Sequence, residues 1–323
     1  MPAPHIDRTG FLSAAFAAIV FGAAYPVTAI ALRSFQPVAL AALTGTLALV
    51  IILLLAVVGP LSRPRDWVLT RGQAGQLALL GLLGGLAFAV AMNVAVGLAG
   101  PTITSFVATL YAVLATLFAV PLLGERIRPS TIAALAVALV GTVLLAGFDP
   151  LRTPLLGILV ALGAAIVFAL YLVLARRWGA GHALDGTLVT IAVLVGRGPV
   201  LLLVELLCEP DRILPTSPDP AAFVALALLV VGPSTTAQLA VLASVKRVSA
   251  RRTSAALLLT PPASAAIAAV GLNERLAPVE IIGAVLVLAG IAGAGGALEF
   301  ILGGRNRHRI ATESEAASHA RVV

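Results

Sequence analysis

Residues 110–147 read LYAVLATLFAVPLLGERIRPSTIAALAVALVGTVLLAG, and residues 259–296 read LTPPASAAIAAVGLNERLAPVEIIGAVLVLAGIAGAGG. In each copy an apolar run ends in a short polar turn, GERIRP in the first and NERLAP in the second, and another apolar run follows. Proline suits the first turn of a helix, because the donor that it lacks would be unpaired there anyway. The chain therefore contains one helical hairpin twice. The residues predicted to shape the two turns are Glu125, Arg126 and Pro129, and Glu274, Arg275 and Pro278.

The composition around these hairpins is that of a membrane protein. Hydrophobic residues make up 60% of the 323 residues and charged residues 11%, with a mean hydropathy of +1.08. Apolar runs of about 20 residues, the length that spans a bilayer as a helix, recur along the whole chain. We count ten and predict an all-α integral membrane protein. The predicted spans are 11–33, 37–59, 74–97, 101–121, 129–147, 155–175, 186–208, 221–243, 250–271 and 278–301.

The distribution of Lys and Arg predicts the orientation of these spans. The cations concentrate in alternate connections, for example at Arg63, Arg65 and Arg71, and they are sparse in the others. Under the positive-inside rule this pattern places both termini in the cytoplasm. The net charge of +7 is thus interpreted as lipid-facing anchors, and no nucleic-acid partner is expected.

The duplication predicts two inverted five-helix repeats, because an odd number of spans in each repeat makes the two copies face opposite ways. The pentapeptide AAIVF, at 17–21 and again at 164–168, marks the start of each repeat. We predict a first repeat within 1–150 and a second within 151–302. Residues 303–323, polar and without an apolar period, are predicted to be a disordered cytoplasmic tail.

Arg197, midway along the seventh run, is the most unusual candidate for a binding residue. A cation at mid-depth is costly unless it meets a water-filled cavity or a partner. Pro199 and two glycines beside Arg197 predict a broken or kinked helix there. Arg197 is interpreted as a ligand for a substrate carboxylate or phosphate. The alternative is a structural cation tied to freed carbonyls or to Glu205.

Seven further residues are predicted to line a substrate site at mid-depth between the repeats. For Tyr25 and Tyr171 the alternative is anchoring at the membrane interface, and for Tyr171 this alternative is favoured. For the others it is packing or hydrogen bonding between helices. These residues are Tyr25, Tyr111, Tyr171, Thr109, Thr260, Asn93 and Gln238.

The sequence carries no pattern typical of catalysis. All four histidines lie outside the predicted spans, and we find no nucleophile with a base, no metal-ligand spacing and no phosphate-binding glycine loop. We therefore expect no enzyme activity, no catalytic residue, no cofactor and no metal site. The expected partners are a small-molecule solute and the lipid bilayer, and the expected oligomeric state is monomer or homodimer.

The ten spans, the two terminal hairpins with their Glu-Arg turns and the FGAAY motif at 21–25 resemble the drug/metabolite transporter superfamily, of the EamA type. This resemblance covers about 10–302. It implies a bacterial inner-membrane exporter of small metabolites that works by alternating access without ATP.

Two departures from the superfamily's pattern bear on the energy source. Many members have Glu-Pro in the fourth and ninth helices, where this chain has Tyr111-Ala112 and Thr260-Pro261. The early second helix often carries an Arg, where this chain has Thr44. The departures favour facilitated efflux over proton coupling.

The combined expectation is a carrier that exports amino acids, with neutral aromatic or branched ones first. The alternatives are a multidrug exporter of lipophilic cations, a nucleotide-sugar-type carrier and, in a different class, a non-transporting membrane scaffold.

Overall fold

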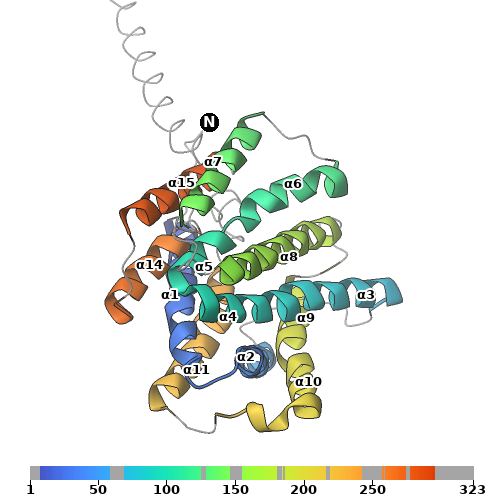
Figure 1. The fold of residues 1–323 in the computed structure, drawn as a ribbon. Coiled ribbons are helices and arrows are strands. Elements are labelled where there is room, and N and C mark those ends of the chain that lie inside the picture. The colour runs from blue at the N-terminus through green and yellow to red at the C-terminus, as the bar shows by residue number, and fades with distance from the viewer. Residues whose placement is uncertain are drawn as a thin grey trace, which may run out of the picture.

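The computed structural model describes residues 8–58, 69–124, 129–145, 155–179, 184, 186–215, 219–241, 257, 259–273 and 277–294. Those residues form helices and contain no strand (Figure 1). In the first half the helices are α1 (Arg8–Ala31), α2 (Pro37–Val58), α3 (Arg71–Leu80), η1 (Gly81–Ala87), α4 (Phe88–Ala99), α5 (Pro101–Ala108), α6 (Tyr111–Leu123) and α7 (Pro129–Leu145). In the second half they are α8 (Leu155–Gly179), α9 (Gly186–Val195), η2 (Gly196–Val200), α10 (Leu201–Cys208), η3 (Pro210–Arg212), α11 (Pro220–Val231), η4 (Gly232–Ala237), α14 (Thr260–Gly271) and α15 (Pro278–Ala294).

The predicted all-helical membrane fold is confirmed. Seven helical segments within the described residues are long and apolar enough to cross a membrane. The other three predicted spans correspond to α7, α14 and α15, which are described over 17, 12 and 17 residues. Both hairpin prolines begin a helix, Pro129 in α7 and Pro278 in α15.

Several predictions concern parts of the chain outside the described residues. Glu125, Arg126, Glu274 and Arg275 of the hairpin turns belong to these parts. So do the predicted boundary between the repeats, at about residue 150, and the tail from 303 onward. The domain limits and the disorder of the tail therefore stay predictions.

The fourth predicted span is not a continuous α-helix. It stops at Ala108, turns at Thr109 and Leu110, and starts again at Tyr111 as α6. The amide of Leu110 donates to the carbonyl of Val107 at 3.1 Å, which closes a tight turn. In the second repeat the equivalent residue, Leu259, also lies in a turn directly before α14. Helices α6 and α14 thus each begin directly after a turn, at equivalent positions of the two repeats.

Three other spans contain a π-helical turn, in which the backbone is wider than in an α-helix. These turns are η1 in the third span, η2 in the seventh and η4 in the eighth. Pro199 lies inside η2, and it removes one donor from the helical ladder. The irregular helix predicted around Arg197 is therefore present as a π-helical turn.

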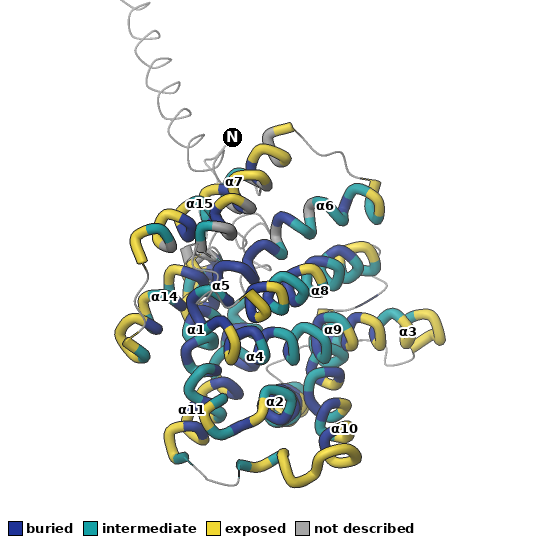
Figure 2. Tube along the Cα trace, in the orientation of Figure 1, coloured by how far each residue is buried: buried dark blue, intermediate teal, exposed yellow. Residues whose placement is uncertain are grey.

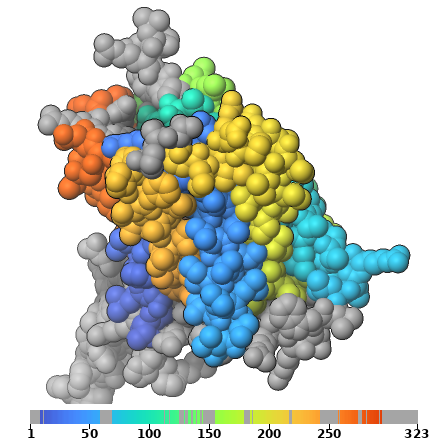
Figure 3. Space-filling model, turned by 90° about the horizontal axis from the view of Figure 1, so that it is seen from below, coloured from blue at the N-terminus to red at the C-terminus, as the bar shows by residue number. Residues whose placement is uncertain are grey.

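The main helix contacts join one repeat to the other. Helix α1 packs against α14 and α11 of the second repeat, while its counterpart α8 packs against α6, α5 and α4 of the first. Helix α2 packs against α9, η2 and α10, and α7 lies beside α15 (Figure 1). Seen from below, α2 lies between residues 220–241 and residues 186–215 (Figure 3). The two repeats therefore interlock along most of their length.

The pairing of α7 with α15 is reciprocal at the level of single residues. A Cβ added at Gly141 would lie 2.6 Å from the amide nitrogen of Val287. A Cβ at Gly290, its equivalent, would lie 2.6 Å from the amide nitrogen of Ala138, the equivalent of Val287. A two-fold axis between the two helices produces such reciprocal contacts, because each helix then uses the same surface.

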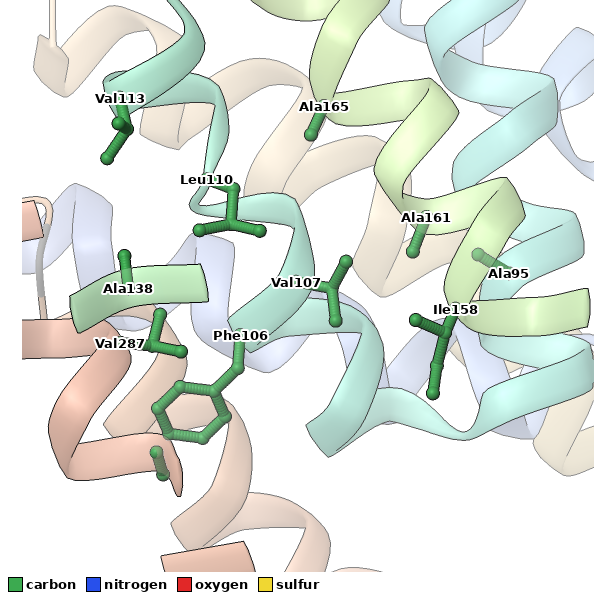
Figure 4. Close-up of a cluster of buried hydrophobic side chains, with 11 residues drawn as sticks. Ala95, Phe106, Val107, Leu110, Val113, Ala138, Ile158, Ala161, Ala165 and Val287 are labelled. Atoms are coloured by element: carbon green, nitrogen blue, oxygen red, sulfur yellow. The ribbon is translucent and has the colours of Figure 1, made fainter. Parts of the chain in front are cut away.

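The largest apolar cluster surrounds α5. Val107, Leu110 and Val113 are almost fully buried there, against residues of α4, α7, α8 and α15 (Figure 4). Every residue of α5 except Ile103 is buried, while the outer faces of the surrounding helices are exposed (Figure 2). Exposed leucines and valines on those faces suit a lipid environment. Helix α5 therefore occupies the centre of the bundle.

Candidate functional site

An aromatic cluster lies where α1, α4, α6 and α8 meet. We define it as Tyr25, Phe88, Tyr111, Phe168 and Tyr171. The ring of Phe168 stacks on Phe88 with centroids 4.4 Å apart. It forms a T-shaped pair with Tyr111 at 5.0 Å and a tilted pair with Tyr171 at 5.4 Å. Tyr25 and Phe88 both pack against the buried residues Met92, Ala108 and Ala164. The structure thus brings Tyr111 and Tyr171 together around Phe168, and Tyr25 packs against the same buried residues as Phe88.

The local sequence explains how these rings reach one place. Tyr111 is the first residue of α6, directly after the interruption at Thr109 and Leu110. Gly84 of η1 lets Tyr171 approach, because a Cβ at that glycine would lie 2.6 Å from the tyrosine ring. All three tyrosines are half-buried, and none of their hydroxyl groups bonds to another described residue. The cluster therefore offers both apolar ring surface and unused hydrogen-bonding groups.

Arg197 lies in η2, and its side chain reaches the other repeat. The Nη2 atom donates to Oγ1 of Thr44 in α2 at 2.8 Å, and Thr44 is fully buried. The hydroxyl of Thr44 in turn donates to the carbonyl of Leu40 at 2.7 Å. The Nε atom of Arg197 is buried and has no partner. One nitrogen of the Arg197 guanidinium is therefore hydrogen-bonded, and further N–H groups of the guanidinium remain as donors.

Arg197 has no carboxylate partner among the described residues. Glu205, the carboxylate predicted as its structural partner, has a buried Oε2 atom that bonds to no other described residue. A half-buried cation whose Nε is buried, with only a neutral partner, is costly, because the lost hydration is only partly replaced. The arrangement can accept an anion, and the planar fork of a guanidinium matches a carboxylate.

Helix η1 connects Arg197 to the aromatic cluster. Its Gly84 contacts Tyr171, and the next residue, Gly85, faces the backbone of Val193 and Arg197. No described contact joins the Arg197 side chain directly to an aromatic ring. The aromatic cluster and the backbone of Arg197 thus lie on either side of the same turn of η1.

The remaining predicted residues are not part of this pair of features. Thr109 is buried, and its Oγ1 donates to the carbonyl of Phe106 at 2.6 Å. Thr260 is the buried first residue of α14. Gln238 follows η4, is half-buried, and makes no hydrogen bond to another described residue. Thr109 thus has a local helical role in this conformation, and Gln238 has a free amide.

Asn93 joins two helices, and this contact leads to a prediction. Its Nδ2 atom donates to the carbonyl of Pro37 at 2.9 Å, which ties α4 to the start of α2. Replacing Asn93 with alanine should lower the stability by about 1 kcal/mol, the scale of one hydrogen bond between membrane helices. Thermal unfolding in detergent micelles measures this loss. Solute affinity should stay unchanged, and a large fall in affinity at full stability would instead place Asn93 in the binding site.

Sequence reasoning missed Phe88, Phe168 and the bond from Arg197 to Thr44. The repeated pentapeptide AAIVF was a signal for Phe168, because it ends on that residue in the second repeat. Phe88 has no comparable signal. The role of Thr44 depends on a contact between residues far apart in the chain, which a helical pattern does not report.

Comparisons with known proteins support the fold. Twenty-five chains among the solved structures match this one. One of them, described only as "Crystal structure of protein", is 22% identical with a TM-score of 0.62, and the match covers 88% of this chain and 97% of that one. At this identity the likeness shows the fold alone. No curated protein matches the chain.

The family models give the more specific result. The model described as "EamA-like transporter family" matches the chain twice, over residues 8–147 and again over 155–295. The two matches agree with the duplicated helices and with the interlocked packing of the repeats. The resemblance inferred from the hairpins is therefore confirmed. The chain belongs to the EamA-like transporter family, a family of membrane transporters in the drug/metabolite transporter superfamily.

Proposed function

We propose that this protein is a secondary transporter that exports small metabolites bearing a carboxylate, amino acids first, by alternating access. The observation that carries the proposal is the Arg197 guanidinium, which is held by the neutral hydroxyl of Thr44 and has its Nε buried without a partner. A solute carboxylate would complete its hydrogen bonding and neutralise its charge.

The aromatic cluster supports a neutral aromatic or branched amino acid as the solute. Rings with offset or edge contacts provide apolar surface for a side chain, while the free tyrosine hydroxyls can bond to an amino group. The family membership supports transport as such, and the site supports the class of solute.

The interlocked repeats support alternating access. Two repeats with a two-fold relation have two equivalent ways to pack, and exchange between these opens the site to either side. The positive-inside pattern supports an orientation with both termini in the cytoplasm. The resemblance to the superfamily supports a bacterial inner membrane. An oligomeric state of monomer or homodimer remains the expectation.

The test is solute counterflow in proteoliposomes, with labelled neutral amino acids and, for each, the amine that lacks the carboxylate. The wild type should exchange the amino acids saturably. Arg197→Gln should weaken their apparent affinity by about 30-fold or more, because a buried charged hydrogen bond is worth roughly 2 kcal/mol or more. Amines should not distinguish the two proteins.

Two controls separate binding from structure. Arg212→Gln removes an exposed arginine that pairs with Glu209, and it should exchange like the wild type. Thr44→Val removes the partner of Arg197 and leaves the guanidinium in place, so it should retain more affinity than Arg197→Gln. Unchanged amino-acid affinity in folded Arg197→Gln would contradict the proposal. If the protein exchanged lipophilic cations or nucleotide sugars and no amino acids, the proposed solute class would be wrong.

A further inference from the structure

The three glycines of η1 are all buried, and Gly84 differs from the other two in what a side chain there would meet. A Cβ at Gly81 would lie 2.5 Å from the carbonyl oxygen of Ala192, and a Cβ at Gly85 would fall onto another backbone oxygen of α9. At Gly84 the three nearest atoms all belong to the ring of Tyr171, at 2.6, 2.8 and 2.9 Å. A side chain at position 84 would therefore displace a ring, whereas one at the other two glycines would displace a helix.

The surroundings of Tyr171 determine where a displaced ring can go. On one side it packs against three leucines that are almost fully buried, namely Leu77, Leu80 and Leu184. Such close-packed side chains do not give way without strain. Its other described ring neighbour is Phe168, in a tilted pair with centroids 5.4 Å apart. The hydroxyl of Tyr171 bonds to no other described residue, so nothing there holds the far end of the ring. A displaced ring therefore moves toward the aromatic cluster.

We propose that Gly84 is a positioning residue that sets the largest side chain the carrier accepts, and that its bare backbone admits neutral amino acids with aromatic side chains. Without a Cβ at this position, the Tyr171 ring lies against η1 and leaves the space beside Phe168 to the solute. A single methyl group at position 84 moves the ring into that space. In an apolar pocket one such group changes discrimination between solutes by roughly tenfold to 200-fold. This inference rests on the proposed function, because it assigns the aromatic cluster to the side chain of the solute.

The first experiment is counterflow in proteoliposomes with a series of labelled amino acids of increasing size: alanine, valine, leucine and phenylalanine. Gly84→Ala should weaken the apparent affinity for phenylalanine by roughly tenfold or more and leave that for alanine unchanged. The matched control is Gly163→Ala in α8, where a Cβ would meet nothing within 4 Å, and it should give the wild-type series. A wild-type series in folded Gly84→Ala overturns the proposal.

The second experiment separates an effect through Tyr171 from a general effect on the fold. Tyr171→Ala removes the ring, so adding Gly84→Ala to it should cause no further loss of phenylalanine affinity. An equal loss in both backgrounds overturns the proposal, because the glycine would then act independently of the ring. If Gly84→Ala does not fold, Tyr171→Ala carries the test alone. It should raise the affinity for tryptophan relative to phenylalanine, and an unchanged ratio overturns the proposal.

The third measurement needs no solute. Near-ultraviolet circular dichroism reports the packing of aromatic rings. Gly84→Ala should change this spectrum when Tyr171 is present and leave it unchanged in the Tyr171→Ala background. An unchanged spectrum with Tyr171 present overturns the proposal. A wild type that exchanges no amino acid overturns the proposed function and this inference together. Exchange by the wild type with an unaltered series in Gly84→Ala overturns this inference alone.

Discussion

Gly198→Ala is expected to abolish the folded transporter. A Cβ at this position would fall onto the backbone nitrogen of Thr46, and it would lie 2.5 Å from the carbonyl carbon of Gly45. These atoms belong to the backbone of α2 and cannot rotate away as a side chain can. Overpacking of this kind costs roughly 3 kcal/mol or more. The yield of monodisperse protein in detergent, followed by thermal unfolding, measures the effect.

A matched control exists in the same span. Gly186 begins α9, and a Cβ there would meet nothing within 4 Å. Gly186→Ala should therefore unfold like the wild type. Gly45→Ala should be as harmful as Gly198→Ala, because its Cβ would lie 2.6 Å from the amide nitrogen of Gly198. A well-folded Gly198→Ala protein would show that α2 and η2 do not pack this closely.

Gly290→Ala is expected to have the second-largest effect, by separating α15 from α7. The added Cβ would lie 2.6 Å from both the carbonyl oxygen of Ala134 and the amide nitrogen of Ala138. We expect a loss of roughly 3 kcal/mol, since neither backbone atom can move without displacing α7. The loss is measured as a lower unfolding temperature in micelles.

The two-fold relation sharpens this second prediction. Gly141→Ala should be destabilising to a similar extent, because Gly141 makes the reciprocal contact. Gly293→Ala should be much milder, since its Cβ would meet only the Cβ of Ala134 at 3.3 Å. If Gly141→Ala were harmless while Gly290→Ala unfolded the protein, the contact would not be reciprocal.

The sequence predicted the helical fold well because each helix is marked by local features. Pro37 and Pro220 begin α2 and α11, and the predicted second span, 37–59, begins at the same residue as α2. The irregular turn at Arg197 was also predictable, because Pro199 and the glycines beside it are local signals. Long apolar runs and prolines are properties of single segments, and a sequence displays them directly.

The interruption between α5 and α6 was missed for the opposite reason. Thr109, Leu110 and Tyr111 include no glycine or proline, so the predicted span runs through them. In the second copy Pro261 and Pro262 follow the equivalent turn and do signal a helix start. Aligning the two repeats residue by residue would have transferred this signal to the first copy.

The candidate site was predictable as a set of residues and not as an arrangement. Tyr25, Tyr111 and Tyr171 were named from the sequence, but their shared neighbour Phe168 was not. The partner of Arg197 was missed in the same way, because Thr44 lies 153 positions earlier in the chain. Such contacts arise from the interlocking of the repeats, and no single span encodes them.

The position of Arg197 in only one of the two repeats bears on the orientation of a bound solute. The backbone has a two-fold relation, but α2, the counterpart of the helix that carries Arg197, contains no charged residue. A symmetric frame alone would hold a solute equally well head-first or tail-first, and one guanidinium removes that degeneracy. With Arg197 bound to the solute carboxylate, as proposed, the solute sits with one polarity, so that the same end leads on every outward passage and trails on every inward one. Half-saturation concentrations measured from the two faces of the membrane should therefore differ.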